Sequence, residues 1–160
     1  MNEIKYPYIP EGKEIKYVVI GNEFMRAAKE ILDHKGCVKH PTSAVVVKDG
    51  KIVGRGTNAG KIVEVCPRWG SPTGTNYGPC KEICGQEGHS EVTSIADAKK
   101  KGNETMGADL YLYGHWWCCE NCWNTMEKAG IRNVYLLDKS WELFNPDFNQ
   151  EMKEWGRPKN

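Results

Sequence analysis

Two short groups of residues have the types and spacing needed to hold a catalytic metal ion. One places His89 two residues before Glu91, and the other places Cys119 three residues before Cys122. One imidazole and two thiolates leave the fourth tetrahedral position of a zinc ion open to water, as in catalytic zinc sites. Zinc lowers the pKa of that water to about 7, which makes hydroxide available at neutral pH. Glu91 is then placed to accept the proton and pass it on, so we predict a hydrolytic zinc site.

Both groups are predicted to begin helices. Residues 89–101 follow a helical pattern that ends at Gly102, and residues 119–129 follow another that ends at Gly130. The first turn of a helix offers free N–H groups and partial positive charge, which lower the pKa of a thiol there. Residues three apart also share one helical face. The sequence therefore predicts two metal-binding groups at two helix N-termini.

The other elements are predicted from periodicity and turn signals. They comprise a helix over residues 24–32 capped by Asn22, strands over 43–47 and 51–56 joined at Asp49-Gly50, strands over 108–113 and 133–137, and a short last helix over 147–155 that packs through Phe148, Met152 and Trp155. The alternation of strands and helices implies parallel pairing with right-handed crossovers. We expect an α/β protein with a three-layer α/β/α fold, in which a mixed sheet of about five strands joins an antiparallel hairpin to parallel strands.

Composition limits the class of protein. A chain of 160 residues suits a single domain spanning residues 1–160. Its 22 basic and 21 acidic residues give a net charge of +1, which does not favour a polyanionic partner such as nucleic acid. Residues 1–20 mix charges with two prolines, unlike a signal peptide or a membrane span. Seven cysteines without a secretion signal indicate metal binding or catalysis in a cytoplasmic protein, with no membrane association.

The two groups together resemble the cytidine and deoxycytidylate deaminase family. That family's signature is His-x-Glu followed by Pro-Cys-x-x-Cys, and its zinc water attacks the amine-bearing carbon of the base. The resemblance runs from about Phe24 to Leu137. It implies the family's fold, zinc held by His89, Cys119 and Cys122, proton transfer by Glu91, and a homo-oligomer. The implied reaction converts a small-molecule cytosine nucleotide, foremost dCMP, to its uracil counterpart with release of ammonia.

Two features depart from the family pattern. Cys118 stands where the family has proline, so a frame in which Cys118 and Cys122 are the ligands stays open beside the frame with Cys119. The spacing with two intervening residues is the commoner one for zinc and favours Cys119. Residues 113–117 also make the loop before the cysteines longer than is usual in the family. That difference bears on the substrate preference.

The remaining cysteines suggest a second metal. Residues 57–88 form a long irregular insert, rich in Gly, Pro and Cys. This insert resembles one that holds a structural zinc at the same place in some deoxycytidylate-specific members of the family. The resemblance implies four thiolate ligands here, Cys37, Cys66, Cys80 and Cys84. His40 or His34 could replace one of them. The alternative is that these residues are ordinary reduced thiols.

Several residues are candidates for binding the substrate. Asn58 matches a family asparagine that contacts a sugar hydroxyl, although Asn in a Thr-Asn-Ala-Gly stretch is also a turn former. Trp116 and Trp117 could stack on a pyrimidine or pack in the core. Tyr113 and His115 could line the same pocket. A 5′-phosphate needs a cation, for which the candidates are Arg68, Arg55 and Arg26.

Other activities are compatible with the same metal ligands. The chemistry also serves free cytidine, guanine, and cytosine or adenosine in nucleic acid. A protein of another class, which binds zinc without catalysis, could keep the fold. The cysteine-bearing insert favours dCMP, the near-neutral charge argues against a polynucleotide, and Glu91 argues against a silent metal site.

Overall fold

The computed structural model describes residues 4–32, 40–58 and 88–154. Its five strands form one mixed sheet in the order β1-β5-β4-β2-β3: β1 Ile15–Val18, β2 Ser43–Lys48, β3 Lys51–Thr57, β4 Asp109–Tyr113 and β5 Asn133–Leu137. β5 pairs in parallel with β1 and β4, whereas β2 pairs antiparallel with β3 and β4. The predicted hairpin joined to parallel strands is confirmed.

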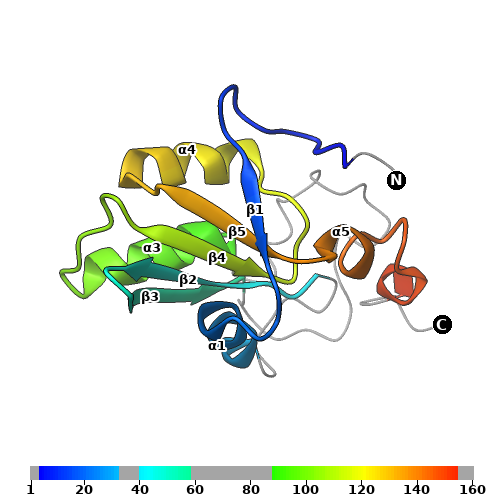
Figure 1. Cartoon of the computed structure of the whole chain (residues 1–160), viewed down its shortest axis with the longest axis horizontal. Coiled ribbons are helices and arrows are strands. Elements are labelled where there is room, and N and C mark those ends of the chain that lie inside the picture. Colours follow the sequence, from blue (N-terminus) through cyan, green and yellow to red (C-terminus); the bar gives the residue numbers. More distant parts are fainter. Residues whose placement is uncertain (1–3, 33–39, 59–87, 155–160) are drawn as a thin grey trace.

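Helices cover both faces of the sheet (Figure 1). α1 (Glu23–Ile31) lies on one face, and α3 (Ser90–Lys100) and α4 (Glu120–Ala129) lie on the other. Both faces of the sheet need a covering of helices, because the buried side chains of β2 alternate between the two faces. Ala44 and Val46 join the core beneath α3 and α4, while Val45 and Val47 join the core beneath α1. The three-layer prediction is confirmed.

Local sequence signals set several element boundaries. The Asn22 side chain accepts hydrogen bonds from the backbone N–H groups of Phe24 and Met25 at 3.0 and 3.1 Å, so it caps α1 as predicted. The β2–β3 hairpin turns at Asp49 and Gly50, both with positive φ (50° and 75°). Such turns match the twist of the two strands they join. The predicted helix cap and hairpin turn are thus confirmed.

α3 packs very closely against β3 through two glycines. A Cβ atom on Gly54 would lie 2.8 Å from the Ala98 Cβ, and one on Gly56 would lie 2.7 Å from the Thr93 carbonyl carbon. Both separations are shorter than carbon atoms tolerate, so only glycine allows this approach. The position of α3, and of the residues at its start, therefore depends on these glycines.

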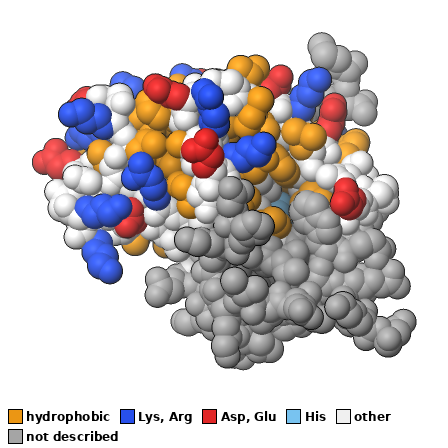
Figure 2. Space-filling model, turned by 90° about the horizontal axis from the view of Figure 1, so that it is seen from below, with side chains coloured by type: hydrophobic (Ala, Val, Ile, Leu, Met, Phe, Trp, Pro, Cys, Tyr) orange, Lys and Arg blue, Asp and Glu red, His pale blue; other side chains and the backbone are white. Residues whose placement is uncertain are grey.

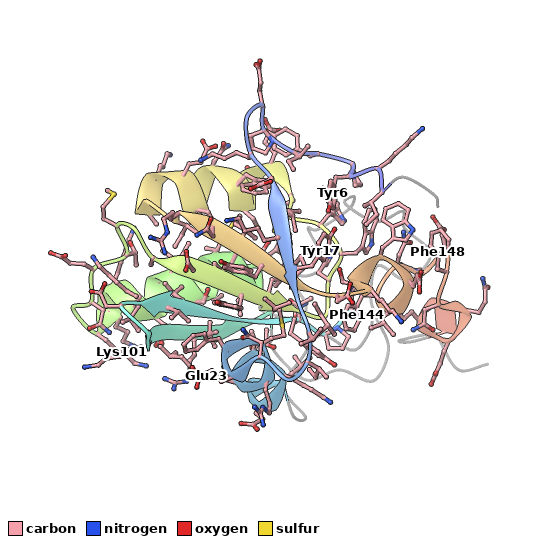
Figure 3. All side chains as sticks on the ribbon, viewed as in Figure 1. Tyr6, Tyr17, Glu23, Lys101, Phe144 and Phe148 are labelled. Carbon is pink, nitrogen blue, oxygen red and sulfur yellow. The ribbon has the colours of Figure 1, made fainter. Side chains whose placement is uncertain are left out.

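The periphery differs from the sequence-based expectation. β1 was not predicted; it is the edge strand beside β5, and the Tyr6 and Tyr17 hydroxyls hydrogen-bond to each other (Figure 3). α5 (Ser140–Leu143) was not predicted either, and a 3₁₀ helix at Gln150–Glu154 replaces the expected last helix. Met152 is buried as expected, but Phe148 is 49% exposed. Trp155 lies outside the described residues.

The described surface carries mixed charge. Figure 2 shows basic and acidic side chains interspersed with apolar ones over the described part of one face. This distribution agrees with the near-zero net charge. Among the described helices, none has the length and apolar character required to cross a membrane.

Candidate metal and active site

One end of the sheet brings the predicted metal-binding groups together. α4 connects the parallel strands β4 and β5, so the loop before α4 lies at the carboxyl end of β4. α3 begins beside the end of β3, where the Thr93 hydroxyl donates to the Thr57 carbonyl at 2.9 Å. His89 and Cys119 occupy the N-cap positions of α3 and α4, and neither side chain caps its own helix. Both side chains are instead directed to a common point.

The three donor atoms have separations that suit one zinc ion. The Nδ1 atom of His89 lies 3.4 Å from the Sγ atoms of Cys119 and of Cys122, and the two Sγ atoms are 3.2 Å apart. Tetrahedral zinc, with bonds of about 2.3 Å to sulfur and about 2.0 Å to nitrogen, separates such atoms by about 3.5 to 3.8 Å. Among the described residues, His89, Cys119 and Cys122 form the group whose donor atoms converge in this way.

The surroundings of Cys119 favour a thiolate. The hydrogen bond between the Cys119 and Cys122 sulfurs, helped by His89 and by the backbone N–H of Cys122 in the first turn of α4, lowers the pKa of Cys119 to about 4, although burial opposes the shift. The same hydrogen bond and burial raise the pKa of Cys122. Zinc ligation requires thiolates, so binding at this site releases the proton of a cysteine that is still a thiol.

Burial distinguishes Cys118 from its neighbours. Its side chain is fully buried and belongs to the core beneath α3 and α4, whereas Cys119 is partly exposed. Burial raises the pKa of the Cys118 thiol well above its ordinary value, which disfavours a thiolate. The geometry therefore favours the frame with Cys119 and Cys122 as the ligand pair.

Glu91 lies in the first turn of α3, two residues after His89. It is 4% exposed, and burial raises the pKa of its carboxyl group, while the charge of His89 and the Cys122 thiol oppose the shift. A buried carboxyl group with a raised pKa is suited to acid-base work, because it binds a proton more readily than an ordinary carboxylate.

Comparison with known proteins identifies the family. A model of the cytidine and deoxycytidylate deaminase zinc-binding region matches residues 20–138. The chain belongs to this family. It is accordingly a zinc-dependent hydrolytic deaminase, and the resemblance found in its sequence is confirmed.

Solved structures support the fold of the deaminase. The dCMP deaminase of cyanophage S-TIM5 is similar in its apo form, with 20% identity, a TM-score of 0.50 and coverage of 81% of this chain and 89% of that chain. The structure of the same enzyme in complex with dCMP and dUMP has 20% identity and a TM-score of 0.51, and the match covers 84% of this chain and 92% of that chain. Guanine deaminase from Bacillus subtilis gives 21% identity, a TM-score of 0.45 and coverage of 82% and 74%. No curated protein sequence matches the chain.

The predicted substrate contacts of the deaminase are placed in different surroundings. The side chain of Asn58 is buried, where its Oδ1 accepts from the Thr42 N–H at 3.0 Å and its Nδ2 donates to the His40 carbonyl at 2.7 Å. Tyr113 packs edge-on against Phe144 in the core on the α1 side. Asn58 thus has a structural role that the sequence did not reveal, and Tyr113 contributes to the core.

The aromatic residues before the cysteines are buried. Trp116 and Trp117 are each 7% exposed, and Trp116 packs edge-on against Trp141 of α5 with ring centroids 4.8 Å apart. Among the described residues, no hydrogen-bond acceptor faces either indole N–H group. The Nδ1 atom of His115 accepts from the backbone N–H groups of Trp116 and Trp117 at 2.9 and 3.2 Å, which fixes the shape of the loop.

Some candidates cannot be placed. Arg68 and the four cysteines assigned to a second metal, Cys37, Cys66, Cys80 and Cys84, lie outside the described residues. Of the alternative phosphate-binding residues, Arg26 donates to the Gly21 carbonyl at 3.2 Å, and Arg55 is exposed on β3.

The structure also reveals a pair that the sequence did not single out. Thr42 and Ser90 are both buried, and their hydroxyl oxygens lie 2.5 Å apart. Each is an ordinary residue for the start of a strand or a helix, so no local signal marks them. Only the fold brings the two hydroxyls together.

Proposed function

We propose that this deaminase converts dCMP to dUMP with release of ammonia, using His89, Cys119 and Cys122 as zinc ligands and Glu91 as the acid-base residue. The observation that carries the proposal is the convergence of the three donor atoms beside a buried carboxyl group. The preference for dCMP is supported by the cysteine-bearing insert, and the mixed surface charge argues against a polynucleotide.

In the proposed mechanism Glu91 carries two protons in succession. The chemistry that zinc supplies when bound is a water ligand acidic enough to act as a nucleophile near neutral pH. Glu91 would accept one proton from the attacking water and deliver it to ring nitrogen N3 while the water oxygen bonds to C4. Glu91 would then transfer the second proton of the water to the amino group, which leaves as ammonia. The raised pKa of Glu91 suits both the acceptance and the delivery.

Trp116 and Trp117 are proposed to line the pocket for the base. Their buried indole N–H groups have no acceptor in the part of the chain that the structure describes, and an unpaired buried donor costs about 1–3 kcal/mol. A substrate oxygen could supply the missing acceptor. The buried indole N–H of Trp123 in α4 also has no acceptor, so this feature supports the proposal without being specific to the site. His115 and Asn58 complete the proposed pocket, whereas Tyr113 packs against Phe144 on the α1 side.

Recognition of the nucleotide requires a phosphate contact. We assign it to Arg68, with Arg55 and Arg26 as the alternatives, because a guanidinium forms paired charge-assisted hydrogen bonds with phosphate. The proposal further includes a homo-oligomeric enzyme in the cytoplasm.

One assay tests the substrate. Purified protein is incubated with dCMP, dCTP, deoxycytidine, cytidine, guanine and a short DNA oligonucleotide, and ammonia release is measured for each. We expect kcat/KM for dCMP to exceed that for deoxycytidine by about 10-fold or more, the value of one charged hydrogen bond. Preferential turnover of guanine or the oligonucleotide would replace the proposal, and no turnover by zinc-loaded protein would favour a non-catalytic role.

Two variants test the phosphate contact. Arg68→Ala is expected to lower kcat/KM for dCMP toward the value for deoxycytidine. Arg132→Ala is the matched control, because Arg132 is exposed and pairs with Asp109 at the start of β4, the opposite end of that strand from the site. Equal effects of both variants would contradict the role of Arg68.

A further inference from the structure

The buried Thr42 and Ser90 hydroxyl pair lies directly behind the candidate catalytic turn. Ser90 is the residue between His89 and Glu91, and its Oγ lies 2.5 Å from the Oγ1 of Thr42. Ser90 is fully buried and Thr42 is 4% exposed, so water does not compete for this hydrogen bond. The hydroxyl of Thr42 therefore holds the first turn of α3, which carries both a candidate zinc ligand and the candidate acid-base group.

Thr42 is itself held on its other side by Asn58. The Thr42 N–H donates to the Asn58 side chain at 3.0 Å, and the Asn58 N–H donates to the Thr42 carbonyl at 3.2 Å. The Asn58 Nδ2 donates to the His40 carbonyl at 2.7 Å. Residues 40–42 are thus locked to the end of β3 by three hydrogen bonds, which gives Thr42 a fixed position from which to hold Ser90.

The same segment contacts the loop that precedes the two cysteine ligands. The Nε2 atom of His40 lies 2.8 Å from the Gly114 carbonyl oxygen, and the His40 ring stacks on His115 at 4.3 Å with an interplanar angle of 8°. His115 in turn accepts the backbone N–H groups of Trp116 and Trp117. Cys119 follows two residues later. Residues 40–42 therefore contact both the first turn of α3 and the loop that leads to Cys119.

We propose that residues 40–42 form a strut that sets the spacing between the His89–Glu91 half and the Cys119–Cys122 half of the site, with Thr42 as its principal positioning residue. Groups that orient metal ligands typically change metal affinity or activity by about 10- to 100-fold when removed. A small displacement of Glu91 also lowers the rate of proton transfer, since catalysis requires close alignment. The inference rests on the proposed roles of His89 and Glu91.

Thr105 provides a matched control for loss of a buried threonine hydroxyl. Its Oγ1 donates to the Ala129 carbonyl at 2.7 Å, and the residue is 7% exposed. Ala129 is the last residue of α4, whereas the metal-binding cysteines lie at the start of that helix. Thr105→Val thus removes a similar hydrogen bond far from the site.

The test compares Thr42→Val, Thr42→Ser and Thr105→Val with the wild type in the zinc-loaded protein. Zinc release to a chromophoric chelator, Tm, kcat and KM are measured for each. We expect Thr42→Val to release zinc about 10-fold faster or more and to lower kcat about 10-fold, with KM changed less than about two-fold. Thr42→Ser keeps the hydroxyl and should restore both properties. Thr105→Val should lower Tm without altering zinc release or kcat.

Ser90→Ala supplies a second variant should Thr42→Val fail to fold. If the two hydroxyls act through one hydrogen bond, the effects of Thr42→Val and Ser90→Ala on zinc release are not additive in the double variant. The strut would be overturned if Thr42→Val and Ser90→Ala left zinc release and kcat at the wild-type values, as Thr105→Val is expected to do. If the wild type is inactive on every substrate, the proposed function fails, but the zinc-release comparison still decides the role of Thr42.

Discussion

Glu91 combines two properties at the residue scale: its side chain is buried, and it lies two positions from a candidate zinc ligand. Glutamine has nearly the same shape but cannot accept and return a proton. We predict that Glu91→Gln keeps zinc at the wild-type content and lowers kcat at least 100-fold, within the usual range for loss of an acid-base group. Ammonia release and metal content, measured on the same preparation, check both statements.

Two outcomes would count against this role for Glu91. Unchanged turnover in Glu91→Gln would remove the carboxyl group from the mechanism. Loss of zinc along with activity would mean that Glu91 supports the metal site instead. The control is Glu127→Gln, since Glu127 is exposed on α4 near its C-terminal end and should retain full activity.

Residue types and spacing were sufficient to predict His89, Glu91, Cys119 and Cys122 as a group that the fold brings together. They could not decide between Cys118 and Cys119, because both spacings to Cys122 allow metal binding. The choice depends on which side chain faces the core, and that is a property of the packed helix. Thr42 and Ser90 could not be predicted, since residues 48 positions apart meet only through the tertiary fold.

At the element scale, the close packing of β3 on α3 links the sheet to the candidate catalytic turn. A Cβ on Gly56 would lie 2.7 Å from the Thr93 carbonyl carbon, near the start of α3. We predict that Gly56→Ala lowers the free energy of unfolding by about 1–3 kcal/mol, because the helix must move to admit the methyl group. Urea unfolding measures the change.

Gly21→Ala is the matched control for Gly56→Ala. A Cβ at Gly21 meets no atom within 4 Å, so the same substitution there should change the free energy of unfolding by less than about 0.5 kcal/mol. Similar losses in both variants would mean that chain flexibility, and not packing of α3 on β3, determines the effect.

Asp97 on α3 also ties the helix to β3. Its carboxylate accepts from the Arg55 backbone N–H and from Lys101, both at 2.9 Å. Partial burial alone would raise the pKa of Asp97, but these two hydrogen bonds and the nearby positive charges lower it below its ordinary value. Asp97 therefore binds a proton more readily in the unfolded state than in the folded state. The stabilisation that the ionised carboxylate gives to the fold is present above about pH 4 and is lost as the pH falls through the folded-state pKa.

The prediction concerns Asp97→Asn. This variant should be less stable than the wild type at pH 6, and the difference should be smaller at pH 3, because the Asp97 carboxyl group of the unfolded wild-type chain, with an ordinary pKa of about 3.9, is then mostly protonated. Urea unfolding of both proteins at the two pH values provides the comparison. A difference that is the same at pH 6 and pH 3 would show that the charge of Asp97 does not stabilise the fold.

Elements with strong local signals were predictable, and weakly patterned ones were not. The hairpin, the capped helix α1 and the strand β5 each have either a turn signal, a cap or a buried run of apolar residues. β1 has a single buried residue, Ile15, because it forms the edge of the sheet, and α5 is four residues long. Such elements form through contacts with the rest of the protein, so their sequences carry little periodicity.

At the scale of the whole molecule, the chain topology explains where the site lies. The turn before α4 lies at the carboxyl end of β4, and α3 begins beside the end of β3, so the two donor groups meet at one end of the sheet. This is the usual place for ligand sites in α/β proteins. The order of the elements from α1 to β5 was predictable from the sequence, whereas β1 and α5 were not predicted, and the meeting of the donor groups followed from that order.

The number of zinc ions per chain is a prediction about the whole molecule that rests on the cysteine positions and on the resemblance to family members with a structural zinc. Cys37, Cys66, Cys80 and Cys84 could supply four thiolates, which enclose a zinc ion and leave no open position. We predict about two zinc ions per chain by elemental analysis of the purified protein. Because a structural zinc contributes to folding, Cys66→Ser should lower both the zinc content, toward one, and the Tm.

Two further variants separate the two metals. Cys119→Ser should also lower the zinc content toward one, and it should abolish ammonia release. It should lower the Tm less than Cys66→Ser does, because a catalytic zinc with an open position contributes less to the stability of the fold than a structural zinc. Cys118→Ser is the control, because that buried thiol belongs to neither set of ligands and should leave two zinc ions bound. A wild-type content near one would exclude the four-cysteine site, and the insert at residues 57–88 would then need another source of stability.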